Sequence, residues 1–212
     1  MVKEIGLIAI ALIIGTCGFA QDGDASIYEN KKGLLRSGLG LKMGGSSAFS
    51  SYYASGDLEY YIDDKVSFEG ESNYFLGNLT TPANYTVVNH HSILTGVNYH
   101  LMSGKGFDPY VGLKIGVGLS EIDRINHEDG TECYEDLQVD PMAAIQLGFN
   151  YYTGKYFHLF METGYQTQGH STKANPSLKL NEFNFKFGLG IHVDWLKNMK
   201  IGARGPKAKP ML

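Results

Sequence analysis

The thirteen residues from Phe183 to Trp195 read F-N-F-K-F-G-L-G-I-H-V-D-W, and this stretch decides the fold. Apolar side chains occupy every odd-numbered position, and polar residues or glycine occupy every even-numbered one. Because successive side chains of a β-strand point to opposite faces, such a strand has one apolar and one polar face. A half-buried strand of a soluble protein alternates over about 4–8 residues, whereas a tilted strand that crosses a bilayer needs about 9–11. The stretch therefore predicts a transmembrane strand.

Further stretches of the chain alternate in the same way, at 34–43, 54–62, 65–76, 91–101, 108–120, 139–152 and 156–166. Short turns separate some of them, at 63–64, 103–106 and 153–155, and long loops separate the others, at 44–53, 77–90, 121–138 and 167–181. Tight turns at one end and loops at the other are typical of bacterial outer-membrane barrels, whose turns face the periplasm. We therefore predict an all-β fold, an eight-stranded antiparallel up-and-down transmembrane β-barrel with both termini in the periplasm.

The N-terminus has the layout of a secretory signal. Lys3 precedes the apolar run 5–14, and small residues up to Ala20 precede polar ones. We expect cleavage after Ala20. The run is shorter than the roughly 20 residues of a membrane anchor, and a lipoprotein signal ending at Cys17 fits its consensus poorly. The expected domains are a signal peptide (1–20), a polar N-terminal lead-in (21–32), an outer-membrane β-barrel (33–195) and a basic periplasmic tail (196–212).

Composition argues against several kinds of partner and cofactor. The net charge of −4 and the lack of a basic face argue against nucleic acid. Cys133 is the only cysteine left after cleavage, so we expect neither a disulfide framework nor a cysteine-based metal site. The acidic loop 121–138 lacks the D-x-D-x-D-G pattern of a calcium site. We predict no cofactor and no metal.

The charged residues of the predicted strands fall on the polar face. An Arg or Lys facing lipid at the midplane costs about 2–4 kcal/mol, so we place this face in the lumen. A secreted carrier of the lipocalin type would reverse the two faces, but the many glycines on the polar face suggest a crowded inner wall. Buried charges need partners. We predict a lumen ion-pair network of Arg36, Lys42, Glu59, Glu69, Glu71, Lys114, Glu162 and Lys186, which plugs the barrel or, alternatively, gates a narrow ion path.

Aromatic residues gather near the strand ends, as expected of belts at the two membrane interfaces. Strand ends also favour aromatics in general, which is the alternative explanation. At the loop end these are Tyr74, Tyr165 and Phe183. The predicted interface aromatics of the periplasmic end are Tyr60, Tyr99, Tyr151, Tyr156 and Trp195.

Four fragments resemble the small outer-membrane β-barrel superfamily that includes the OmpA transmembrane domain, OmpX and OmpW. They are D-P-Y-V-G-L-K-I-G-V-G-L (108–119), L-E-Y-Y-I (58–62), L-T-G-V-N-Y-H-L (94–101) and F-K-F-G-L-G-I-H-V (185–193). The resemblance covers about residues 33–195. It implies the bacterial cell outer membrane as location, with membrane lipids and lipopolysaccharide as contacts. It also implies that the insertion machinery reads the last strand at Trp195, although residues 196–212 follow that aromatic, which is a departure from the family.

The predicted function is that of a non-enzymatic outer-membrane barrel protein, structural or interacting through its extracellular loops, and we expect a monomer. One alternative is a porin-like narrow channel or a carrier for small apolar molecules, as in OmpW-like proteins. A rim lipid hydrolase is the weakest alternative. Its candidate pairs, His91-Ser92 and His170-Ser171, are adjacent residues, which face opposite sides of a strand.

Overall fold

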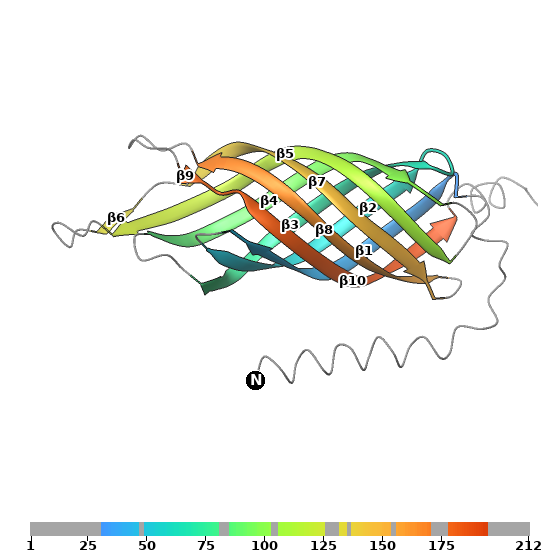
Figure 1. Cartoon of the computed structure of the whole chain (residues 1–212), viewed down its shortest axis with the longest axis horizontal. Helices are drawn as coiled ribbons and strands as arrows, with labels where there is room; N and C mark the ends of the chain where they lie inside the picture. The colour runs from blue at the N-terminus through green and yellow to red at the C-terminus, as the bar shows by residue number, and fades with distance from the viewer. Residues whose placement is uncertain are drawn as a thin grey trace, which may run out of the picture.

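A computed structural model describes residues 31–46, 49–80, 85–102, 106–125, 132–134, 137–153, 156–170 and 178–194. Eight long strands surround a central lumen, and two short strands extend one end (Figure 1). Among the described residues, no helix has the length and apolar character needed to cross a membrane. The strands are β1 (Leu34–Gly45), β2 (Ser50–Tyr61), β3 (Val66–Thr80), β4 (Tyr85–His100), β5 (Phe107–Ile125), β6 (Glu132–Tyr134), β7 (Gln138–Tyr152), β8 (Phe157–His170), β9 (Leu178–Lys179) and β10 (Glu182–Asp194).

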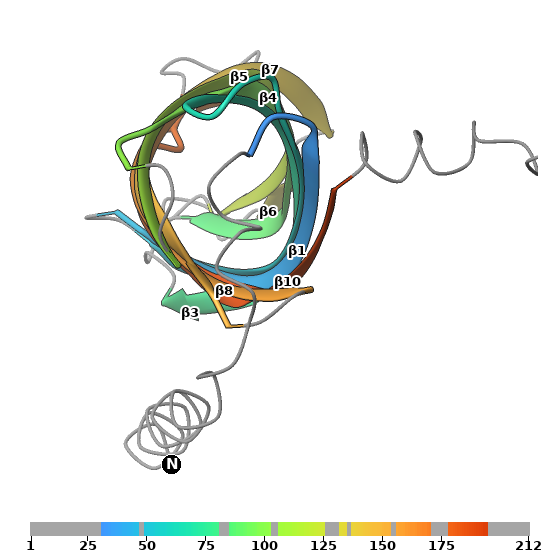
Figure 2. The ribbon, with the colours of Figure 1, turned by 90° about the vertical axis from the view of Figure 1, so that its right-hand side faces the viewer.

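The long strands pair antiparallel in chain order, and the last strand closes the barrel on the first. On β10, Lys186 is opposite Lys42 of β1 on one side and opposite Glu162 of β8 on the other. Figure 2, a view along the barrel, shows the resulting closed ring. The predicted eight-stranded antiparallel barrel is therefore confirmed.

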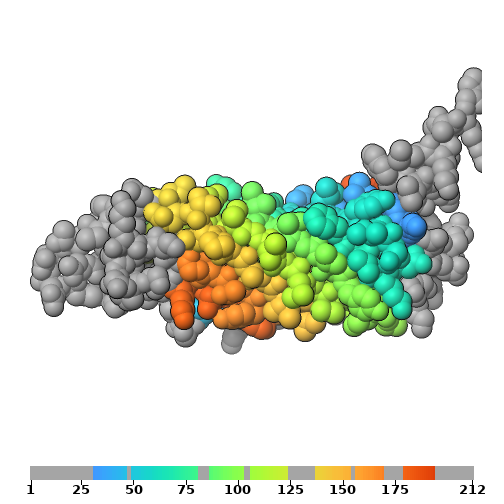
Figure 3. All heavy atoms as spheres, turned by 90° about the horizontal axis from the view of Figure 1, so that it is seen from above, coloured from blue at the N-terminus to red at the C-terminus, as the bar shows by residue number. Residues whose placement is uncertain are grey.

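The faces of the strands are oriented as predicted. Leu113 and Ile115 are 65% and 69% exposed on the outer wall, whereas Lys114 between them is only 2% exposed. On β10, Leu189 points outward and Lys186 is buried. A lipocalin-type carrier would show the reverse, so the structure excludes that alternative. Figure 3 shows one face of this outer wall, where side chains of successive strands form a continuous surface.

Glycines on the inner wall make room for larger side chains. A Cβ at Gly38 would lie 2.7 Å from the Phe160 ring, and one at Gly188 would lie 2.5 Å from it. Gly148 leaves similar room for Tyr110. The inner wall is therefore crowded, as the glycine pattern predicted.

The loops at one end are shorter than predicted, and here the sequence interpretation was wrong. The loop predicted at 44–53 shrinks because β2 begins at Ser50, and the loop at 77–90 shrinks because β3 ends at Thr80 and β4 begins at Tyr85. Similarly, β5 extends to Ile125 and β8 to His170, with β6 and β9 paired to them. Strand pairing requires only backbone hydrogen bonds. It therefore continues into residues where the strict alternation of apolar and polar side chains has ended.

Candidate functional site

Ion pairs fill the middle of the lumen. Lys114 contacts Glu69 at 2.8 Å and also Glu71, and Lys186 lies 3.0 Å from Glu71 and 3.3 Å from Glu162. Lys42 lies 3.1 Å from Glu71, so this one carboxylate holds three ammonium groups. Buried charges are tolerated when each has such partners.

A second cluster lies next to the first and is centred on Arg36. Its guanidinium contacts Glu59 at 2.7 Å and also the Asn150 side chain. Asp57 lies 3.7 Å from Arg36 and 3.9 Å from Lys186, and so links the two clusters. The structure thus places all eight predicted network residues in the lumen, where they are buried. Sequence reasoning placed Asp57 on the same face but omitted it from the network.

Three of these carboxylates approach one another closely enough to hold a metal ion. Oxygen atoms of Glu69, Glu71 and Glu162 all lie within 4.8 Å of one another. However, Lys114 and Lys186 already pair with all three. A divalent cation would have to displace two ammonium groups that have no other charge partners as close, so the donor set fits an ion-pair plug and does not fit a metal.

A layer of aromatic and polar side chains closes the turn end of the lumen. The Tyr61 hydroxyl donates to Asp108 at 2.9 Å, and His100 Nδ1 lies 3.0 Å from the same carboxyl oxygen. Lys31 completes the layer with an ion pair of 2.6 Å to Asp108. Lys31 belongs to the predicted lead-in, yet its side chain is buried in the end of the barrel.

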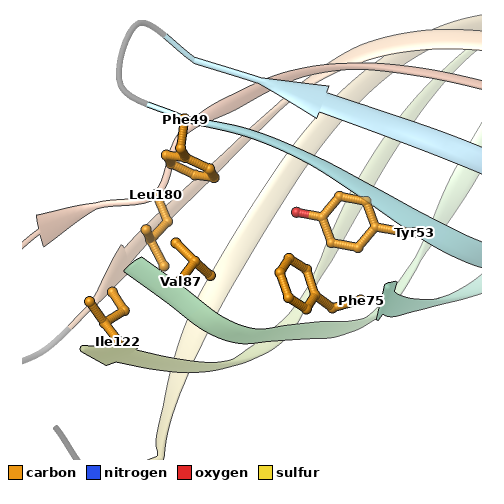
Figure 4. Packing of buried hydrophobic residues seen from close by; sticks show 6 residues of the cluster. All are labelled: Phe49, Tyr53, Phe75, Val87, Ile122 and Leu180. Carbon is orange, nitrogen blue, oxygen red and sulfur yellow. The ribbon is translucent and has the colours of Figure 1, made fainter. Parts of the chain in front are cut away.

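An apolar cluster closes the loop end. Figure 4 shows its residues gathered together, with four of them on β2, β3, β4 and β5 and the other two just outside β2 and β9. The hydroxyl of Tyr53 donates to Glu182 at 2.7 Å and lies 2.8 Å from His90 Nδ1, so a polar group lies against the cluster. The cluster consists of Phe49, Tyr53, Phe75, Val87, Ile122 and Leu180.

The barrel wall has a seam beside this cluster. The β3–β4 ladder runs from Val66↔Tyr99 to Asn73↔Ser92. Beyond that last pair, toward the loop end, no register pair joins residues 74–80 of β3 to residues 85–91 of β4 among the described residues. In these same segments, β3 remains paired with β2, and β4 remains paired with β5. We call the gap between 74–80 and 85–91 the β3–β4 seam. Two of the cluster's residues, Phe75 and Val87, lie on its two sides.

A groove lies on the outer wall below the seam. Its volume is about 450 Å³, and it crosses β1 to β4. Small residues such as Gly56 and Gly70 form its floor, and its upper end includes Ser72 and Ile93. Ser72 and Ile93 form the register pair just below the last pair of the ladder. The groove therefore ends just below the seam, where β3 and β4 are still in register.

The other predicted residues are placed as follows. Tyr60, Tyr99 and Tyr156 are exposed on the outer wall and Tyr151 is half-buried, whereas Trp195 lies outside the described residues. His91 points outward and Ser92 inward, so that His–Ser pair is split across the wall. Ser171, the signal peptide and the basic tail also lie outside the described residues.

Sequence reasoning missed the seam, the apolar cluster and Lys31. A signal for the first two existed, because Val87 and Val88 break the alternation at a position where the structure has a bulge in the β4–β5 register. Phe75 and Tyr53 are apolar or aromatic residues on an otherwise polar face, which marks the cluster. Lys31 has no such signal, because it precedes the first strand.

Comparison with known proteins supports the fold. No protein-family model and no curated protein matches the chain. The crystal structure of Neisserial surface protein A matches with a TM-score of 0.52 at 17% identity, over 76% of this chain and 96% of that one. The outer membrane protein OprG from Pseudomonas aeruginosa matches with a TM-score of 0.53 at 17% identity, over 77% of this chain and 97% of that one.

The chain has the fold of the small outer-membrane β-barrels. This agrees with the resemblance found in the sequence fragments. At 17% identity the likeness concerns the fold, so any function must be argued from the lumen and the wall.

Proposed function

We propose that this chain is a non-enzymatic barrel of the bacterial outer membrane, closed to ions, that acts as a structural element of the envelope or through its extracellular loops. The turn end faces the periplasm in this proposal, and the outer wall contacts lipids and lipopolysaccharide. The observation that carries the proposal is the filled lumen. Apolar, ionic and aromatic layers follow one another along its length, and their side chains are buried.

The ionic layer supports closure on energetic grounds. An ion crossing the lumen would have to separate Lys114 and Lys186 from their carboxylates. Removing one partner of a buried pair costs about 3–5 kcal/mol. Eight strands also enclose a space that side chains can fill completely. The layer therefore acts as a plug that fixes the shape of the barrel.

Planar-bilayer recording of the refolded protein tests the closure. We expect no discrete conductance steps from the wild type at neutral pH. The variant Glu71→Ala, which leaves three ammonium groups without their shared carboxylate, serves as the comparison because it disturbs the plug directly. Steady unitary currents from the wild type would contradict the proposal.

A lipid-hydrolysis assay on the same sample tests the non-enzymatic part. We expect no turnover of phospholipid or lipopolysaccharide. Turnover by the wild type that disappears in Ser92→Ala or Ser171→Ala would show that the barrel is an enzyme.

A second candidate function is that of a carrier for small apolar molecules, and the seam favours it. The outer groove ends just below the seam, and the apolar cluster includes Phe75 and Val87 from the two sides of the seam. A small apolar molecule could thus pass between the membrane and the loop end of the lumen without crossing the ionic plug. This route differs from a channel because it requires no conductance.

Locking the seam tests the carrier function. The rings of Tyr74 and His91 stack across the seam with centroids 4.6 Å apart, so we choose Tyr74→Cys with His91→Cys, in a Cys133→Ser background. Uptake of the apolar dye N-phenylnaphthylamine into proteoliposomes should stop on oxidation and return on reduction. Equal uptake in both redox states, or none in the wild type, would contradict this function.

A further inference from the structure

The seam is held together by side chains instead of a ladder. Among the described residues, two hydrogen bonds cross it. The Phe75 backbone N–H donates to His91 Nδ1 at 3.0 Å, and the Asn78 side-chain amide donates to the Val87 carbonyl at 2.7 Å. Backbone groups left unpaired in an apolar surrounding are costly, so these two bonds help to keep the seam closed, together with the stacked rings of Tyr74 and His91.

The hydrogen bond at His91 fixes the state of its imidazole. A backbone N–H can donate to Nδ1 only if that nitrogen carries no proton, so the ring must be neutral with its proton on Nε2. A protonated ring would instead direct an N–H at the N–H of Phe75. The bond would be lost, and two donors would face each other.

We propose that His91 is a pH-sensitive latch, which holds the β3–β4 seam closed as a neutral imidazole and releases it when protonated. Histidine is the side chain whose charge ordinarily changes between pH 5 and 8. His91 is half-buried on the outward side of β4. Its neighbour His90 points inward and bonds to Tyr53 and Gln168, so it is separated from this surface.

Two neighbouring strands present groups to His91. On β3, Tyr74 stacks on the ring at an interplanar angle of 26° and offers its aromatic face, which tolerates a cation. On β5, the residue in register with His91 is Leu119, and the nearest acidic residue in register is Glu121. The Glu121 carboxylate already accepts a hydrogen bond from Asn89. Among these groups, the Phe75 N–H is the one whose hydrogen bond needs an unprotonated Nδ1.

Release of the latch would act first on the apolar cluster. Phe75 carries both the N–H that bonds to His91 and a ring that packs in the cluster (Figure 4). Loss of the bond frees the backbone of β3 at the point where the ladder has already ended. The Asn78 bond does not titrate and would limit the opening. As a regulator of access, the latch rests on the proposed carrier function.

Amide hydrogen exchange measured by NMR on the labelled full chain in lipid nanodiscs tests the latch. The protection factor of the Phe75 amide is compared at pH 7.5 and pH 5.5, after correction for the intrinsic rate. Loss of one hydrogen bond should lower it about tenfold in the wild type. The ladder amides of Val66–Asn73 serve as internal controls and should not change.

Two variants isolate the imidazole. In His91→Asn, the amide oxygen takes the place of Nδ1 and does not titrate, so Phe75 should stay protected at both pH values. In His91→Leu, the acceptor is absent, so protection should be low at both. A pH-independent Phe75 amide in the wild type would overturn the latch, and so would a pH effect that persists in His91→Asn.

Dye uptake measured in parallel separates this inference from the carrier function. If N-phenylnaphthylamine does not enter proteoliposomes at either pH, the carrier function fails, and the exchange data alone decide on the latch. If it enters, uptake by the wild type should be several-fold faster at pH 5.5, whereas uptake by His91→Asn should not depend on pH. Equal wild-type uptake at both values would overturn the latch as a regulator.

Discussion

The lower and upper halves of β3 are bound in different ways. From Val66 to Asn73, the strand has ladders on both sides, and its inward Glu69 and Glu71 anchor the ion pairs. From Tyr74 to Thr80, it keeps its ladder with β2 but meets β4 through two side-chain hydrogen bonds and a ring stack. The same strand is therefore fixed near the membrane centre and loosely held near the loops. A barrel with this construction can move at one end without unfolding.

The strongest way to break this contrast is to remove the anchor of the lower half. Glu71→Ala leaves Lys42, Lys114 and Lys186 close together without their shared carboxylate. We expect a loss of about 3–5 kcal/mol in the free energy of unfolding, because unpaired charges remain buried. Denaturant unfolding of the refolded protein in lipid vesicles measures it. Lys179→Ala, an exposed charged residue at the loop end, is the control and should change stability by no more than about 0.5 kcal/mol.

A charge on the outer wall tests whether the lower half lies in lipid. Leu113 is exposed beside the buried Lys114. Leu113→Arg should destabilise the barrel in bilayers by about 2–4 kcal/mol, the cost of a lipid-facing Arg at the midplane. The same unfolding assay applies, and Thr167→Arg, which points outward near the loop end, should cost much less. Equal effects at both positions would mean that Leu113 does not face the membrane core.

A conservative substitution in the apolar cluster tests whether the upper half of β3 opens independently of the lower half. Ile122→Val removes one methylene from a fully buried side chain. We expect a loss of about 0.5–1.5 kcal/mol in unfolding free energy and faster amide exchange in 74–80. Exchange in 66–73 should stay unchanged, because the ion pairs and both ladders are intact. Uniform acceleration along β3 would show that the two halves open together.

The smallest effect is expected in the turn before β3. The backbone N–H groups of Lys65 and Val66 each donate to the Asp63 carboxylate at 2.8 Å and lower its pKa below the usual value. The two hydrogen bonds therefore stabilise the folded protein fully at pH values above the pKa that Asp63 has in the unfolded chain. This stabilisation is lost as the pH falls through the lower pKa that Asp63 has in the folded protein. Asp63→Ala should slightly reduce stability at pH 7 and remove this part of the acid sensitivity. A variant with an unchanged pH profile would contradict it.

The parts of the fold that sequence predicts are those where two environments alternate residue by residue. On β5 and β10, contact with lipid favours apolar side chains on one face, and the crowded lumen favours glycine and paired charges on the other. A period-two pattern such as Leu113-Lys114-Ile115 therefore predicts the strand, the orientation of its faces and the ion-pair residue together. Glycines opposite Phe160 and Tyr110 carry a similar signal, because only small residues fit beside these rings.

The upper parts of the strands and the seam could not be predicted in this way. Above the belt, outward residues such as Asn89 and Glu121 contact solvent, so the pattern ends while the ladder continues. A seam is also a property of two strands, since each of β3 and β4 is well paired on its other side. The break in alternation at Val87 and Val88 marks an irregularity in β4, but it does not show that the register between β3 and β4 ends at Asn73.

The docking of Lys31 has a consequence for the order of assembly. Its ammonium binds Asp108 and the Met102 carbonyl, and its backbone N–H binds Asp64. These partners are 33 to 77 positions later in the sequence and meet only when the hairpins of β2–β3 and β4–β5 have come together. We therefore expect Lys31 to enter the end of the barrel late in folding, after both hairpins are in place.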